Sequence, residues 1–279
     1  MKKKMTVLDF KKYKEEGRKF SYVTGYDYTM ASIINESEVE VILVGDSLGM
    51  VMLGYASTTS VTMDQMIHHI RPVVRGAPNT FIVGDMPFGS YNVSFEEAIT
   101  NANRIMKEGG ADCIKLEGGV EMADTIKMIV RAGIPVMGHI GLTPQTTSQL
   151  GGFKVQGATP ESAKKLIDDA KALEKAGAFS VVLECMPSVV AKAITESISI
   201  PTLGIGAGPF VDCQVLVTQD MLGMFGDFKP KFVKCFANVR QIMIDALNQF
   251  HKESLDGTFP TEEYSFNKEV EIPGVYGPN

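Results

Sequence analysis

The chain has 279 residues, a formal net charge of −6 and 44% hydrophobic residues. It has no long basic run, so we do not expect nucleic acid as a partner. No segment reaches the roughly 18 unbroken apolar residues of a membrane helix, and its four cysteines form no C-x-x-C pair that would indicate a zinc site or a disulfide framework. These properties favour a cytoplasmic protein with a large core or buried subunit surface.

The N-terminal part predicts a short helix that precedes the first strand. Thr6 and Asp9 have the spacing of a capping box, and Gly17 is a typical helix stop. The sequence then predicts a strand over residues 20–24 and a helix over about residues 29–37.

A second strand follows from Val39 and contains the apolar run at residues 41–44. This run does not alternate with polar residues, which is typical of a parallel strand covered on both faces. Asp46 and Ser47 follow directly, where a buried strand reaches the rim of a sheet. Residues 47–61 are rich in Gly, Ser and Thr and predict a long loop of the kind that carries function.

The middle of the chain repeats a strand, helix and glycine stop. Helix starts are predicted at Thr62, at Ser94 and at Thr159, where Pro160 would occupy the first helical position. Helix stops are predicted at Gly110, Gly133 and Gly177, and an apolar strand follows each of them. This order requires parallel strands joined by right-handed crossovers.

Each of five strands is followed, or ended, by an ionisable side chain. These residues are Asp46, Asp85, Glu117, His139 and Glu184. Any one acid in such a position is more often a helix cap or a solvated loop residue. Five at equivalent positions of successive strands predict that they meet at one mouth.

The last third of the chain contains two loops and a long helix. Residues 142–157 interrupt the repeat and predict a functional loop or lid. Residues 204–208 form a Gly-rich loop without the lysine of a P-loop, so close backbone packing explains it as well as phosphate binding does. We expect a last strand over residues 214–217, a helix from about 231 to 252, and an irregular tail over residues 256–279.

About eight strands alternating with helices predict a (β/α)8 TIM barrel. No Pro/Ser-rich linker divides the chain, so we expect a single domain over residues 1–279, preceded by the N-terminal helix. An open doubly wound sheet is the alternative architecture.

The acids of the mouth favour a metal with hard ligands. Asp46, Asp85 and Glu117 offer only oxygen, which suits Mg²⁺ better than zinc. A divalent ion would also offset the repulsion between these carboxylates. Lys115 lies two residues before Glu117 and leaves the strand on the same face, where it would either hold an anionic substrate or form a Schiff base.

Two further residues each have two interpretations. Glu184 is either a general base outside the metal shell or a rim carboxylate paired with a cation. His139 is either a donor that orients a ligand or a satisfied core imidazole. Cys185 is expected to point away from the mouth, because adjacent strand residues face opposite ways.

Nine segments together resemble the ketopantoate hydroxymethyltransferase family. They are V-G-D-S-L-G-M (44–50), T-x-x-V-T-x-D-x-M (58–66), R-G-A-P (75–78), D-M-P-F (85–88), K-L-E-G-G (115–119), G-H-I-G-L-T-P-Q (138–145), L-G-G-F-K-V-Q-G (150–157), L-E-C-x-P (183–187) and G-I-G-A-G (204–208). The resemblance covers the chain from about Phe20 to the F-P-x-x-E-x-S-F segment at 259–266. The residues after Asn267 extend beyond the usual family pattern.

The resemblance implies a cytoplasmic, Mg²⁺-dependent TIM-barrel enzyme of pantothenate biosynthesis, with one metal ion per subunit and often ten subunits in a homo-oligomer. It implies transfer of a hydroxymethyl group from 5,10-methylenetetrahydrofolate to 3-methyl-2-oxobutanoate, giving 2-dehydropantoate and tetrahydrofolate. Position by position, the family's metal site falls on Asp46, Asp85 and Glu117, and its general base on Glu184. Its ketoacid contacts fall on Asp46, Ser47, Asp85 and Lys115.

Two alternatives remain at the level of the sequence. A related barrel aldolase or lyase would share the metal, the ketoacid and the base but would use no folate. A barrel that binds metal without catalysis would show neither activity.

Overall fold

The computed structural model describes residues 2–225 and 230–268. Eight parallel strands form a closed barrel in chain order. They are β1 (Phe20–Thr24), β2 (Val41–Val44), β3 (Phe81–Asp85), β4 (Cys113–Lys115), β5 (Val136–Gly141), β6 (Ser180–Glu184), β7 (Thr202–Ile205) and β8 (Cys213–Leu216). The ring closes where β1 pairs with β8, with Phe20 opposite Cys213. The predicted (β/α)8 barrel is confirmed, and the open sheet is excluded.

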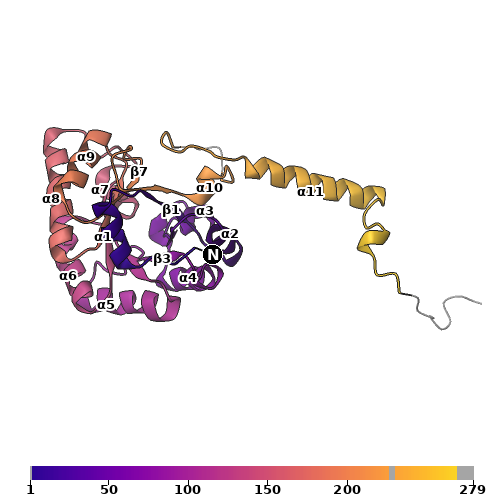
Figure 1. Cartoon of the computed structure of the whole chain (residues 1–279), viewed down its shortest axis with the longest axis horizontal. Coiled ribbons are helices and arrows are strands. Elements are labelled where there is room, and N and C mark those ends of the chain that lie inside the picture. Colours follow the sequence, from indigo (N-terminus) through magenta and orange to yellow (C-terminus); the bar gives the residue numbers. More distant parts are fainter. Residues whose placement is uncertain (1, 226–229, 269–279) are drawn as a thin grey trace, which may run out of the picture.

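Helices surround the barrel, except the last one, which extends away from it (Figure 1). They are α1 (Val7–Glu15), α2 (Tyr28–Glu36), α3 (Leu48–Val51), α4 (Met63–Gly76), α5 (Phe95–Arg104), α6 (Ala123–Arg131), α7 (Thr147–Leu150), α8 (Pro160–Ala176), α9 (Ser188–Ser197), α10 (Thr218–Met221) and α11 (Val239–Asp256). A π-helical turn, η2 (Ile105–Gly109), continues α5, and short 3₁₀ turns occupy η1 (Thr58–Ser60), η3 (Val120–Met122), η4 (Pro144–Thr146) and η5 (Glu262–Tyr264). None of the helices in the described residues is long and apolar enough to cross a membrane.

The predicted helix ends are confirmed where the sequence carries a cap. The Thr62 hydroxyl accepts a hydrogen bond from the Gln65 backbone N–H at 3.2 Å, while the Gln65 side chain accepts one from Thr62 N–H at 2.9 Å. Thr159 caps α8 in the same way, and Gly177 ends that helix with a φ of 101°, which glycine adopts without strain. Local side-chain chemistry therefore sets these boundaries.

Two predicted boundaries were wrong. Residues 47–61 are not a continuous loop, because α3 and η1 lie within them. The last long helix begins at Val239 instead of near residue 231, with Asn238 capping it through the Gln241 N–H. Residues 269–279, part of the predicted irregular tail, lie outside the described residues.

Aromatic side chains pack at the N-terminal end of the barrel. Phe10 of α1 is fully buried, and its ring lies 5.2 Å from Phe20, 5.0 Å from Phe81 and 5.1 Å from Phe179, measured between ring centroids. Edge-to-face contacts of this kind add to the stabilisation from burial. Helix α1 thus covers this end of the barrel, whereas the C-terminal strand ends carry the polar residues described below.

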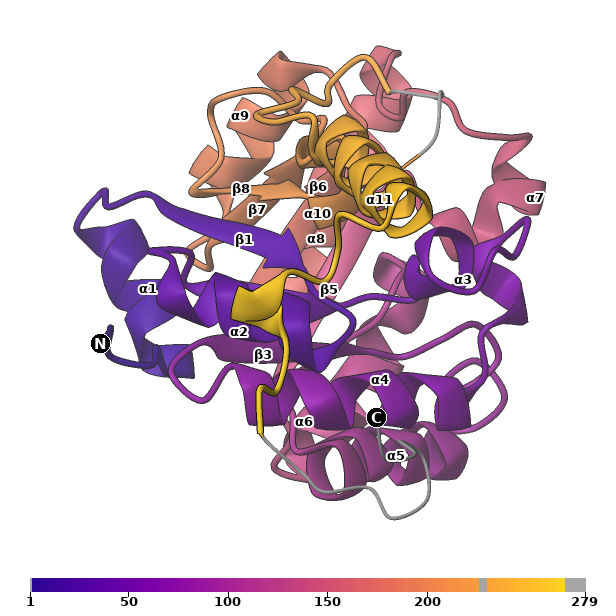
Figure 2. The ribbon, with the colours of Figure 1, turned by 90° about the vertical axis from the view of Figure 1, so that its right-hand side faces the viewer.

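Helix α11 extends away from the barrel (Figure 1), and Figure 2 shows it in front of the barrel, viewed nearly along its axis. It contains no buried residue. Phe250 contacts Phe259 at 5.7 Å between ring centroids, but within the described residues of one chain no apolar side chain of α11 is buried.

Candidate active site

A small cavity lies at the C-terminal ends of the strands. Its volume is about 110 Å³. All seven residues that the sequence singled out line it: Asp46, Ser47, Asp85, Lys115, Glu117, His139 and Glu184. We call this cavity the mouth. The barrel brings these residues together because each lies in, or just after, a parallel strand that ends at the same rim.

Lys115 and Asp85 form a buried ion pair in the mouth. They occupy paired positions on β4 and β3, and the Lys115 Nζ lies 2.8 Å from Asp85 Oδ1. Burial alone would lower the pKa of Lys115, but the carboxylates of Asp85, Glu117 and Asp46 outweigh it and raise this pKa. Lys115 is therefore a fixed cation at neutral pH.

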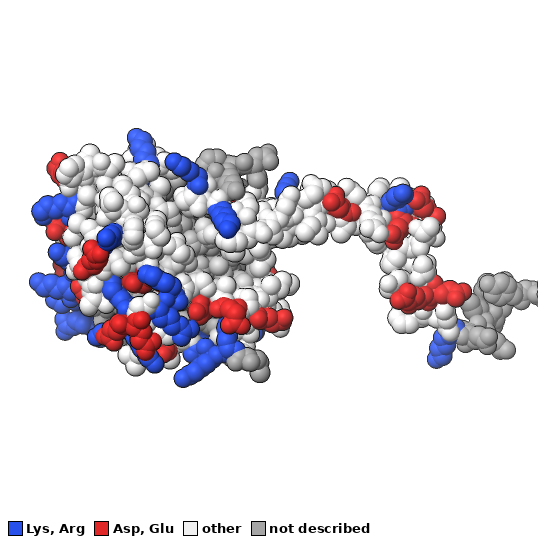
Figure 3. Space-filling view, turned by 45° about the horizontal axis from the view of Figure 1, so that its top comes forward, with Lys and Arg blue, Asp and Glu red and all other residues white. Residues whose placement is uncertain are grey.

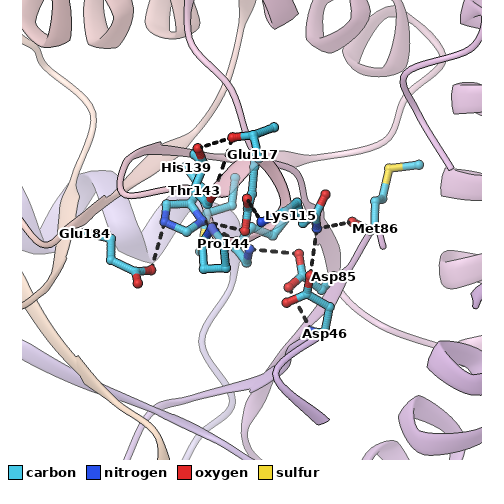
Figure 4. A network of polar contacts seen from close by, with 12 residues as sticks. Asp46, Asp85, Met86, Lys115, Glu117, His139, Thr143, Pro144 and Glu184 are labelled. Atoms are coloured by element: carbon cyan, nitrogen blue, oxygen red, sulfur yellow. Dashed lines mark hydrogen bonds and ion pairs between the residues drawn. The ribbon is translucent and has the colours of Figure 1, made fainter. Parts of the chain in front are cut away.

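His139 lies between two carboxylates (Figure 4). Its Nε2 is 3.1 Å from Glu184 Oε2, and its Nδ1 is 3.4 Å from Glu117 Oε1. Burial and the charge of Lys115 would lower the pKa of His139, but its contacts with Glu117 and Glu184 raise it to about 9. A protonated imidazole in this position can pair with both carboxylates, which is the arrangement expected for a donor that orients a ligand.

The carboxylates of the mouth differ in how well their charge is compensated. Burial, together with Asp85 and Glu117, raises the pKa of Asp46 well above its usual value. Burial also raises the pKa of Asp85, although Lys115 opposes the shift. For Glu117 burial is again the largest effect, yet the contact with His139 and the charge of Lys115 outweigh it and lower the pKa. Of these three carboxylates, Asp46 would therefore be stabilised most by an additional positive charge.

Sequence reasoning missed two buried residues beside the mouth. Gln145 donates from Nε2 to Asp46 Oδ2 at 2.9 Å and from its backbone N–H to Glu117 Oε2 at 3.1 Å. The Tyr91 hydroxyl donates to Gln145 Oε1 at 2.6 Å. The only signal was the position of Gln145 in the predicted functional loop, which does not reveal that its side chain turns inward.

Ser47 and Cys185 each directly follow a carboxylate of the site in the sequence, but only Ser47 lines the mouth. The Ser47 hydroxyl lines the mouth and lies 2.8 Å from the Tyr26 hydroxyl. Cys185 is not among the residues that line the mouth, and it has a φ of 49°, an uncommon conformation for a residue with a side chain. This left-handed residue turns the chain directly after Glu184.

The donor set of the mouth suits a hard divalent cation. Within residues 2–225 and 230–268, no group of three His, Cys, Asp or Glu side chains has the arrangement of a complete metal site. Mg²⁺ does not require one, because proteins usually bind it through one or two carboxylates together with water and substrate oxygens. Asp46 and Asp85 adjoin one another, since the Asp46 backbone N–H donates to Asp85 Oδ2 at 3.1 Å. The residues present therefore fit Mg²⁺, and Asp46 is the carboxylate whose charge the ion would stabilise most.

Comparison with known proteins gives consistent results. The family model for ketopantoate hydroxymethyltransferase matches residues 4–262. A protein of Heliobacterium modesticaldum named 3-methyl-2-oxobutanoate hydroxymethyltransferase is 58% identical over 276 residues, covering 99% of this chain and 100% of the relative. A protein of the same name from Clostridium beijerinckii is 57% identical over 274 residues, covering 98% of this chain and 100% of the relative.

Solved structures with low sequence identity share the fold. A phosphonopyruvate hydrolase in complex with oxalate and Mg²⁺ has a TM-score of 0.60 at 12% identity, covering 93% of each chain. A 2,3-dimethylmalate lyase of the PEP mutase/isocitrate lyase superfamily has a TM-score of 0.58 at 14% identity, covering 94% of this chain and 92% of the other. These likenesses support the barrel fold, while the family model and the full-length relatives decide the family. The chain belongs to the ketopantoate hydroxymethyltransferase family.

Proposed function

We propose that the chain transfers a hydroxymethyl group from 5,10-methylenetetrahydrofolate to 3-methyl-2-oxobutanoate, giving 2-dehydropantoate and tetrahydrofolate. One water molecule supplies the hydroxyl oxygen, so the atoms balance. The observation that carries this proposal is the convergence of all seven candidate residues on one cavity. The names of the full-length relatives support the same reaction.

Asp46, Asp85 and Glu117 are the residues that would hold Mg²⁺. When bound, Mg²⁺ polarises the keto group of a 2-oxo acid and lowers the pKa of the adjacent C–H. Lys115 supplies a fixed positive charge for the anionic substrate, and the Ser47 hydroxyl offers a hydrogen bond.

Glu184 is the proposed general base. Its side chain is 16% exposed, so it reaches the mouth without being freely solvated. His139 Nε2 lies 3.1 Å from Oε2 of this carboxylate, an ion-pair distance that favours one direction of the carboxylate. Glu184 takes the proton from C3 of the ketoacid, and C3 then forms the new bond to the methylene carbon of the folate. Over the whole reaction that carbon loses its bonds to both folate nitrogens and gains the hydroxyl oxygen from water.

The proposal is tested by measuring 2-dehydropantoate in the presence of Mg²⁺ and 3-methyl-2-oxobutanoate, with and without 5,10-methylenetetrahydrofolate. We expect product only when the folate is present. Folate-independent cleavage or condensation of the ketoacid would support an aldolase or lyase instead, and no reaction under any condition would leave a barrel that only binds metal.

Lys115 is expected to act as a charge and not as an imine-forming nucleophile. An imine needs a neutral amine, whereas Asp85 at 2.8 Å favours the ammonium form. Borohydride added during turnover should therefore leave no ketoacid adduct, as intact-protein mass spectrometry would show. A class of aldolase known to form an imine serves as the positive control, and a reduced adduct on Lys115 would overturn this role.

We also propose that the chain forms a homo-oligomer, in which α11 packs on another copy. Leu247 and Phe250 of α11 are 65% and 57% exposed, and the side of α11 seen in Figure 3 carries few charges along its length. The helix that directly follows β8 in the described residues, α10, has a single turn, and Gln214 within β8 is exposed. A helix from another copy would bury the exposed apolar side chains of α11 and cover the outer face of β8.

Light scattering coupled to size exclusion should therefore give the mass of two or more chains of 30.4 kDa each. Leu247→Lys combined with Phe250→Lys is expected to reduce that mass, because each change places a charge in an apolar contact. Asn248→Lys, which changes an exposed polar residue of the same helix, is the matched control. A monomeric parent protein, or the same assembly in the double variant, would contradict the proposed contact.

A further inference from the structure

The segment between β5 and α8 separates the mouth from a second, larger cavity. Pro144 lines the mouth, whereas Thr143 and Thr146 line a cavity of about 760 Å³ on the other side. We call residues 143–146 the partition. Because a cavity adjoins the partition on each side, fewer packing contacts hold these residues in place. Their polar contacts therefore matter more for their position.

Gln145 provides these contacts. Gln145 is buried, with 3% of its surface exposed. Its Nε2 donates both to Asp46 Oδ2 at 2.9 Å and to the Met86 carbonyl at 3.0 Å. Its backbone N–H donates to Glu117 Oε2 at 3.1 Å. One residue of the partition thus contacts two of the three proposed metal ligands.

Tyr91 holds Gln145 from the opposite side. Its hydroxyl donates to Gln145 Oε1 at 2.6 Å and accepts a hydrogen bond from the Glu117 N–H at 3.3 Å. The Gln145 amide can therefore not rotate without breaking bonds to three residues, Asp46, Met86 and Tyr91, which lie on two different loops. This arrangement fixes the plane of the Asp46 carboxylate and occupies one oxygen of Glu117.

We infer that Gln145 is a positioning residue that orients Asp46 and Glu117 for a divalent cation and so couples cation binding to the position of residues 142–157 in which Gln145 contacts Asp46. We call this the closed position. The inference rests on the proposed metal site. Partners behind metal ligands typically change metal affinity about 10- to 100-fold when removed. Coupling is reciprocal: if the closed segment strengthens cation binding, the cation must stabilise the closed segment to the same degree.

The first test is Gln145→Met, which keeps the length of the side chain but removes both donors and adds no charge. We expect Mn²⁺, measured by electron paramagnetic resonance titration without substrate, to bind about 10- to 100-fold more weakly than to the parent protein. Tyr91→Phe removes only the hydroxyl and should weaken binding in the same direction by less. Gln149→Met is the matched control, because Gln149 lies in the same loop and lines only the larger cavity.

The second readout is trypsin cleavage after Lys154, an exposed residue of the same loop. Mg²⁺ should slow this cleavage in the parent protein and in Gln149→Met, but not in Gln145→Met. A purely structural role would lower the melting temperature without changing the effect of the metal on cleavage.

The outcomes separate this inference from the proposal on which it rests. Mn²⁺ affinity equal to the parent in both Gln145→Met and Tyr91→Phe would overturn the role of Gln145 and leave the metal site intact. A parent protein that does not bind Mn²⁺ would overturn the metal site itself, and the inference with it.

Discussion

Replacing Glu184 with glutamine is expected to lower the rate of 2-dehydropantoate formation by about 10²- to 10⁴-fold, the usual contribution of a general base. The amide keeps the shape of the side chain but cannot take up the C3 proton. One of its polar atoms still reaches the His139 Nε2, which lies 3.1 Å from the carboxylate in the parent protein. Cation binding should remain close to that of the parent, because Glu184 is not among the proposed metal ligands.

The rate loss should appear in kcat at saturating concentrations of both substrates. Glu161→Gln is the control, since Glu161 is an exposed residue in the first turn of α8. A Glu184→Gln protein that turns over at the parent rate would show that another group removes the proton, and His139 would be the first to examine because it adjoins the same carboxylate.

Removal of divalent cations is expected to abolish activity, and added Mg²⁺ should restore it. The reason is that the negative charge of Asp46 is poorly compensated. Burial, together with the neighbouring acids Asp85 and Glu117, raises the pKa of Asp46 well above its usual value. A cation in the mouth would favour the ionised form of this carboxylate and polarise the substrate.

The measurement is the initial rate after chelation and after stepwise addition of Mg²⁺, with circular dichroism as a control for the fold. We expect the barrel to stay folded without metal, because its core is built from buried apolar side chains. Full activity in the metal-free protein would contradict the proposal. A tightly bound zinc ion that cannot be exchanged without unfolding would contradict it as well.

The strands could be predicted from the sequence because their signals are local. The apolar run at residues 41–44 and the glycine stop at Gly177 each act over a few residues, and β2 and the end of α8 lie where these signals predict. The start of α11 was misplaced because residues 231–238 have no strong breaker, although Asn238 is a typical N-cap.

The same distinction applies to the candidate site. Asp46 and Glu184 could be found because a polar residue at the end of a buried parallel strand must lie near the rim. Gln145 could not, because its contact with Asp46 joins residues that are 99 positions apart and depends on how the loop folds back over the mouth. The pairing of His139 with Glu184 likewise depends on side-chain geometry across β5 and β6, which no periodicity encodes.

The most direct test of the account is exchange of the C3 hydrogen of 3-methyl-2-oxobutanoate in deuterated water, followed by nuclear magnetic resonance without any folate. If Glu184 removes this proton before the folate reacts, the parent protein with Mg²⁺ should exchange it, and exchange should be strongly slowed by chelation or by Glu184→Gln. Exchange that is equally fast in Glu184→Gln, or that occurs in the parent only when folate is present, would contradict the account.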